Sequence, residues 1–149
     1  MRAVVMRVNG AEVTRTGTGE TLGRIGKGFL VLLGVRVGDT EKEADRIADK
    51  ICGLRIFEDE NGKMNINPKD AGAQMLIISQ FTLFADCRSR RPGFSHAARP
   101  EKAIPLYESV INRCREAGFH VETGVFAAEM LVDSQNDGPI TILLDTKEL

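Results

Sequence analysis

Three polar side chains, Ser79, Gln80 and Thr82, stand at the end of an apolar run that is otherwise typical of a buried strand. Phe81 is the only apolar residue among them. Buried polar groups cost free energy unless they are paired. The cluster is therefore either a satisfied hydrogen-bond network or the lining of a site, and composition alone leaves both open.

A second segment of interest is Asn136-Asp137-Gly138-Pro139-Ile140-Thr141, which lies between two strand-like runs. Its local chemistry favours a simple turn. A functional interpretation would require a Gly138-Pro139 bond held cis, a state that only about one X–Pro bond in twenty adopts in folded proteins.

Other candidate motifs are weaker. The glycine-rich stretch 23–28 lacks the pattern of a phosphate-binding loop, since Thr21 and Gly28 stand where a glycine and a Ser or Thr belong, so a hairpin turn is favoured. Ser95-His96 suggests a nucleophile and its base, but adjacent residues rarely face each other, and we expect loop surface there.

Positive charge gathers after the 74–84 run, at Arg88, Arg90 and Arg91, with Arg99 and Lys102 near the next helix. A solvated face is the usual explanation of such a run. The position beside Ser79–Thr82 makes contact with phosphate groups the alternative, and both interpretations stay open.

Composition sets limits on the class of protein. The 149 residues, 42% hydrophobic and 28% charged, fit one globular domain over 1–149, and the net charge of −1 requires any polyanion to be met by a local patch. Three scattered cysteines without a CxxC pair and two histidines predict neither a disulfide framework nor a metal site, and no cofactor is expected. Apolar runs far shorter than about 20 residues predict a cytoplasmic protein with no membrane partner.

The elements that must position these residues follow from periodicity. A helix should begin at the capping box Thr40/Glu43, and a second should cover 101–117 and stop at Gly118. A hairpin with a type I′ turn is expected at 60–63, between 55–57 and 64–66. The other predicted strands are 2–8 and 11–15, broken at Asn9-Gly10, then 28–35, 74–84, 121–126, 130–134 and 139–145. This pattern predicts an α+β fold or an α/β sandwich, with two main helices on a mixed or antiparallel sheet.

Taken together, the two polar segments resemble the D-aminoacyl-tRNA deacylase (D-tyrosyl-tRNA deacylase) family, whose two marks read SQFTL and NDGPIT in this chain. They stand at Ser79–Leu83 and Asn136–Thr141, in order and with matching flanks. The likeness extends over nearly the whole chain: RV at 7–8, IGKGFLVLLGV at 25–35, RIF at 55–57, GKMN at 62–65, RPGFS at 91–95 and FAAEM at 126–130.

The resemblance implies a chiral proofreading hydrolase that cleaves the ester bond of D-aminoacyl-tRNA and works as a homodimer. Its Gly138-Pro139 bond would be cis, with carbonyl oxygens that reach into the partner's site and reject L-amino acids. Arg7 is similar to the arginine that fixes this motif in the family.

The remaining site residues are also implied by the resemblance. Ser79, Gln80, Phe81 and Thr82 would be catalytic; Phe126 and Met130 would contact the terminal adenosine of the tRNA; Asn136 and Thr141 would bind substrate as well. An ester needs only a positioned water and stabilisation of the oxyanion, which backbone amides around 81–83 are placed to supply. Thr82 is a candidate nucleophile, but no base stands near it in sequence, so we favour a positioning role.

One consequence and one alternative remain. A wall of backbone that excludes an L side chain would not exclude glycine, so glycyl-tRNA is an expected substrate. The alternative class is a non-catalytic nucleic-acid-binding protein that uses the arginine loop, with the polar motifs serving structure.

Overall fold

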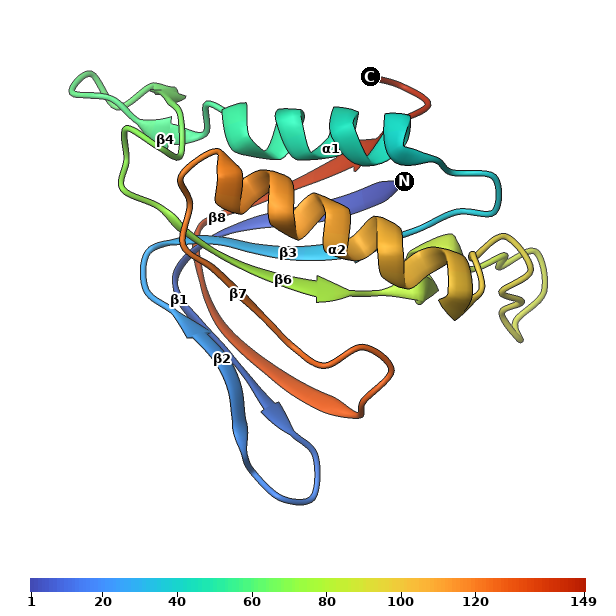
Figure 1. Ribbon diagram of the computed structural model, residues 1–149. Coiled ribbons are helices and arrows are strands. Elements are labelled where there is room, and N and C mark those ends of the chain that lie inside the picture. Colours follow the sequence, from blue (N-terminus) through green and yellow to red (C-terminus); the bar gives the residue numbers. More distant parts are fainter.

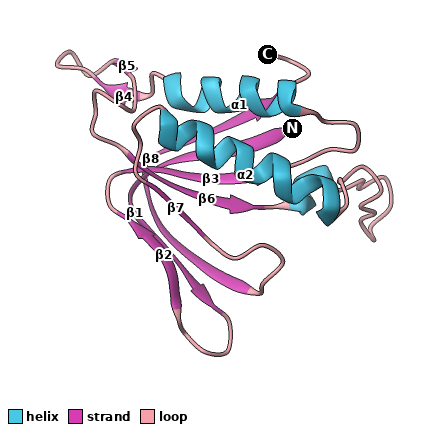
Figure 2. Ribbon diagram, in the orientation of Figure 1, coloured by secondary structure: helices cyan, strands magenta, loops and turns pink.

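Two helices lie side by side on one face of a mixed sheet in the computed structural model, which describes residues 1–149 (Figures 1 and 2). The helices are α1 (Glu41–Gly53) and α2 (Pro100–Glu116), and a short 3₁₀ helix, η1, covers Phe81–Phe84. The strands are β1 (Arg2–Arg15), β2 (Thr21–Ile25), β3 (Gly28–Gly34), β4 (Phe57–Glu58), β5 (Met64–Ile66), β6 (Gln74–Ser79), β7 (Val121–Thr123) and β8 (Met130–Asp145). The predicted mixed α+β class with two main helices is confirmed.

The long strand β1 organises the sheet. Along one edge it pairs antiparallel with β3 and then with β2, and along the other edge it pairs antiparallel with β8 over almost its whole length. Strands β6 and β7 extend the sheet in parallel from β3. Strands β8, β7 and β2 each pair with a single neighbour and therefore have a free edge.

The main core lies between the helices and the sheet. Helix α1 buries Ala44, Ile47, Ala48 and Ile51, which recur at helical spacing, and its start is closed by the expected capping box between Thr40 and Glu43. Helix α2 turns Leu106, Val110 and Cys114, among others, toward the same core. Two amphipathic helices therefore cover one face of the sheet.

A second, smaller core lies on the opposite face. It holds seven buried residues, including Val8, Val13 and Leu76. The sheet curls around this cluster, because β2 approaches β6 and β7, which are not its neighbours in strand order. At Gly23 an added Cβ would lie 2.8 Å from the carbonyl oxygen of Thr123, so this approach requires glycine.

Several predicted boundaries were wrong. Asn9-Gly10 does not break the first strand: β1 is continuous, and the irregularity appears instead as bulges in its pairing with β8. The segments 130–134 and 139–145 likewise form one strand, and the predicted turn at Asn136–Pro139 lies inside β8. Pairing along a long neighbour overrides the local turn propensity at both places.

Two other boundaries differ in detail. The run 74–84 is a strand only to Ser79, and the chain then enters η1. The β4–β5 hairpin forms as expected, but among its turn residues only Gly62 has a positive φ, of 74°, whereas a type I′ turn would require it at Asn61 as well. None of the helices combines the length and the apolar character that crossing a membrane would require.

Candidate active site

An apolar cavity of about 580 Å³ opens where β6, η1, α2 and the start of β8 meet. This volume lies within the range of ligand pockets, which are mostly apolar with a few polar groups. Its lining residues are Leu33, Val35, Ile78, Ser79, Gln80, Phe81, Phe94, Ala97, Ala98, Arg99, Pro100, Ala103, Tyr107, Phe126, Ala127, Ala128, Met130 and Val132.

The polar end of the cavity is built by the turn from β6 into η1. The Gln80 amide donates to the carbonyl of Leu33 at 2.8 Å, and its carbonyl accepts from the Leu83 amide at 3.2 Å. The Gln80 side-chain amide donates to the hydroxyl of Thr82. The amides of Phe81 and Thr82 precede the first bond of this short helix and have no partner within it. Two backbone N–H groups thus stand beside Ser79 and Gln80.

Aromatic rings form two sides of the cavity. The ring of Phe81, which is 55% exposed, meets Phe94 edge to face at 5.1 Å between centroids. Tyr107 of α2 lies 6.1 Å from Phe126 between ring centroids, and its hydroxyl donates to the Ile77 carbonyl at 2.7 Å. Burial raises the pKa of Tyr107 well above its ordinary value, so the hydroxyl stays protonated and serves to tie α2 to β6.

The remaining side is the connection from β7 to β8. Phe126 and Met130 line the cavity, and between them Ala127 takes a left-handed conformation with φ of 63°. An added Cβ at Gly124 would lie 2.5 Å from the Met130 sulfur, so the glycine makes room for this side chain. The sequence-predicted residues Ser79, Gln80, Phe81, Phe126 and Met130 therefore come together around one cavity.

A second cluster forms around the buried guanidinium of Arg7. Its Nη1 donates to the Ile56 carbonyl at 2.8 Å, and its Nε donates to the Asp137 carbonyl at 3.3 Å and faces the Asp137 carboxylate at 3.1 Å. Glu58 stands 3.8 Å from Nη2. The adjoining Gly138-Pro139 peptide is cis. Arg7 thus contacts the 136–141 segment directly.

The two clusters are separate within one chain. Gly138, Pro139, Asn136 and Thr141 are exposed on β8 and do not line the cavity, which takes only Met130 and Val132 from this strand. Gly138 lies six residue steps after Val132 along the extended strand, about 20 Å of chain. Thr82 also lies outside the lining, although its hydroxyl contacts Gln80.

Sequence reasoning assigned no site role to Phe94 or Tyr107, and it considered Arg99 only as a possible phosphate contact. Phe94 belongs to the RPGFS stretch, whose likeness to the family carried no assignment of function. Tyr107 lies within the helix predicted over 101–117, and the partner of its hydroxyl is 30 residues away in sequence. No group of three or more His, Cys, Asp or Glu side chains is arranged to hold a metal ion.

The fold and cavity together define an α+β protein with an apolar, ring-lined pocket that carries polar groups at one end. Residues 4–145 match the family model described as D-Tyr-tRNA(Tyr) deacylase. The chain belongs to this family, whose members are hydrolases of an ester bond.

Individual relatives agree with this assignment. The chain is 54% identical to proteins named D-aminoacyl-tRNA deacylase from Clostridioides difficile, over 99% of both chains, and from Symbiobacterium thermophilum, over 99% of this chain and 97% of the other. A solved structure named "c-Myc DNA Unwinding Element Binding Protein" is 40% identical with a TM-score of 0.91, covering 97% of this chain and 98% of that one. A probable eukaryotic D-amino acid tRNA deacylase, 14% identical with a TM-score of 0.82 over 96% and 97% of the two chains, shares the fold.

Proposed function

We propose that this protein hydrolyses the ester that joins a D-amino acid to the terminal adenosine of tRNA. Family membership supports the reaction. The observation that carries the proposal is the position of Ser79 and Gln80 at the polar end of an apolar cavity, directly before the η1 amides that have no partner within that helix. Phe126 and Met130 would hold the adenosine, and its ester would lie toward η1.

The chemistry needs few groups. A water held by Gln80 and the Thr82 hydroxyl would attack the ester carbonyl, and the amides of Phe81 and Thr82 would stabilise the oxyanion. The bond from the carbonyl carbon to the ribose oxygen would then break, and this oxygen would take up the proton that the water gives up. The Leu83 amide already donates to the Gln80 carbonyl at 3.2 Å, so it is not counted among the oxyanion donors. The Tyr107 hydroxyl keeps its proton, donates it in a hydrogen bond to the Ile77 carbonyl, and takes no part as an acid.

Selection against L-amino acids would come from a second copy of the chain. The Gly138-Pro139 segment is exposed, is held by Arg7 and lies away from the cavity of its own chain, which supports an action in the partner's cavity. Packed backbone there would clash with an L side chain but leave room for a D side chain or for glycine. Asn136 and Thr141 would flank this wall.

The edge strand β8 supports a homodimer. It exposes Leu131 at 61% and Leu143 at 69%, and its outer edge has no neighbour within the chain. A long apolar edge strand is a site for pairing with another chain. The dimer would bring residues 136–141 of one copy to the cavity of the other.

The decisive experiment is hydrolysis of D-tyrosyl-tRNA and L-tyrosyl-tRNA by the purified protein. We expect release of D-tyrosine only, and a lower kcat for Gln80→Ala than for the control Asn112→Ala, which removes an exposed amide on α2 outside the cavity.

Because one 40% identical structure is named as a DNA-binding protein, the second candidate is a nucleic-acid-binding protein without catalysis. Binding of tRNA with no release of D-tyrosine would favour that candidate.

A further inference from the structure

The loop beside the cavity carries an excess of positive charge. Residues 85–102 carry five basic side chains against the two carboxylates Asp86 and Glu101, in a chain whose net charge is −1. Arg99 lines the cavity itself, and Phe94, Ala97 and Ala98 of the same loop form part of its wall. The loop 85–99 is therefore both a wall of the cavity and the most basic part of the chain near it.

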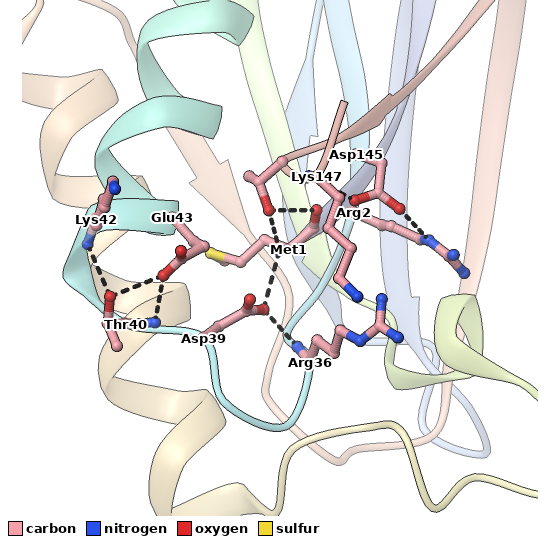
Figure 3. Close-up of polar contacts among 10 residues, drawn as sticks. Met1, Arg2, Arg36, Asp39, Thr40, Lys42, Glu43, Asp145 and Lys147 are labelled. Carbon is pink, nitrogen blue, oxygen red and sulfur yellow. Dashed lines mark hydrogen bonds and ion pairs between the residues drawn. The ribbon is translucent and has the colours of Figure 1, made fainter. Parts of the chain in front are cut away.

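A half-buried arginine from another part of the chain joins this loop. Arg36 follows β3 and forms an isolated bridge with Ala97 of the loop. Its backbone amide donates to Asp39 at 2.6 Å, and Asp39 in turn meets the α-amino group of Met1 at 3.0 Å, so the turn is fixed on both sides (Figure 3). Its guanidinium lies 5.8 Å from the centre of the Phe84 ring, at the end of η1.

A hollow of about 390 Å³ opens on this side of the loop. It is lined by Arg2, Arg36, Phe84, Ala85, Asp86, Cys87, Arg88 and His96. Two of these cations have carboxylate partners, since Arg2 pairs with Asp145 at 2.7 Å and Arg88 pairs with Asp86. The guanidinium of Arg36 has no ion pair. Arg90 and Arg91, which are exposed in the loop between Arg88 and His96, have none either.

We infer that Arg36, Arg90 and Arg91, the loop basic surface, bind phosphate groups of the tRNA strand that leads to the terminal adenosine. The inference rests on the proposed function, which seats that adenosine in the cavity. A strand leaving the cavity must cross one of its walls, and the loop 85–99 is the wall that carries uncompensated cations. Guanidinium groups suit phosphate oxygens because they donate two parallel hydrogen bonds. Contacts of this kind position the nucleic acid and read no sequence.

The test is the affinity for uncharged tRNA as a function of salt, which needs no catalysis. The double variant Arg90→Gln/Arg91→Gln should bind about tenfold more weakly at low salt, and the slope of log K against log salt should fall by about 1–2. Arg36→Gln should weaken binding in the same direction. Arg90→Lys/Arg91→Lys keeps the charge and should retain most of the affinity.

The matched control is Lys50→Gln/Lys63→Gln, which removes the same charge at the end of α1 and in the β4–β5 hairpin, at the opposite end of the helices from the loop (Figure 1). It should leave affinity and slope unchanged. Thermal unfolding midpoints of all variants check that the fold is intact.

Three results would overturn the inference. One is wild-type affinity and slope in the Arg90→Gln/Arg91→Gln variant. Another is an equal loss of affinity in the control Lys50→Gln/Lys63→Gln, which would reflect net charge alone. A third is equally tight binding of duplex DNA of similar length, which would make the surface a general nucleic-acid site. Salt-dependent tRNA binding through these arginines without any ester hydrolysis would support the surface and contradict only the proposed function.

Discussion

Thr82 is the residue of the 79–82 segment whose chemistry is open to two roles. Its hydroxyl accepts a hydrogen bond from the Gln80 side chain, and no histidine or carboxylate forms a hydrogen bond with it. A threonine nucleophile needs a base to take its proton. We therefore expect Thr82→Ala to keep measurable hydrolysis of D-tyrosyl-tRNA, with kcat lowered by roughly 10- to 100-fold, as for loss of one positioning group.

Single-turnover kinetics on the purified variant would measure this residual rate against the rate without enzyme. Thr82→Ser preserves the hydroxyl and should restore most of kcat. Isolation of an aminoacyl ester on Thr82 from the wild-type protein, or a Thr82→Ala rate equal to the uncatalysed one, would establish the covalent role instead.

Among the elements, the parallel pair β3–β6 carries the site, because β6 ends at Ser79 and β3 ends beside Gln80. The pairing starts at Gly28, opposite Gln74, where an added Cβ would lie 1.9 Å from the carbonyl oxygen of Gln74 and 2.6 Å from its nitrogen. Both atoms belong to the backbone and cannot move without separating the strands. We expect Gly28→Ala to lower the free energy of unfolding by more than about 3 kcal/mol.

Urea denaturation would measure this change, with Gly53→Ala as the matched control. Gly53 ends α1, has no heavy atom within 4 Å of an added Cβ, and does not have a positive φ. Alanine there should be neutral or stabilise by up to about 1 kcal/mol. A Gly28→Ala protein as stable as the wild type would show that β3 and β6 are not in the close contact described.

The helices could be predicted from sequence, because their signals are local: the Thr40/Glu43 capping box and the apolar spacing of α1 lie within one segment. The continuity of β1 and of β8 could not be predicted from sequence. It depends on their pairing with each other, and the paired residues are more than a hundred positions apart in the sequence. The same holds for the site. The polar segment 79–82 was identified, but the contact of Tyr107 with Ile77 depends on how α2 packs on β6.

At the scale of the whole molecule, the proposed site is complete only in a dimer. Leu143 of β8 is 69% exposed within one chain. If β8 forms the interface, a carboxylate introduced at this position should be buried without a partner when two chains associate. We expect Leu143→Glu to dissociate the dimer in sedimentation velocity and to abolish selection against L-amino acids. Met64→Glu, at a 55% exposed apolar residue of β5, should leave the dimer intact. A wild-type protein that is monomeric and enantioselective would refute the shared site.

Glycine distinguishes the two ways in which such a dimer could select for chirality. If the partner's Gly138-Pro139 backbone excludes an L side chain, the filter senses only what projects from the α-carbon on that side, where glycine has a hydrogen. Glycyl-tRNA should then be hydrolysed, while L-alanyl-tRNA, larger by one methyl group, should survive. A pocket that instead attracted D side chains would offer glycine no binding free energy in the transition state.

The assay compares D-tyrosyl-, glycyl- and L-alanyl-tRNA at matched enzyme concentrations. We expect kcat/KM for glycyl-tRNA to exceed that for L-alanyl-tRNA by at least about 100-fold. Equal resistance of glycyl- and L-alanyl-tRNA would mean that the cavity recognises the D side chain itself, and Phe81 and Phe94, whose rings meet at its edge, would be the residues to test next.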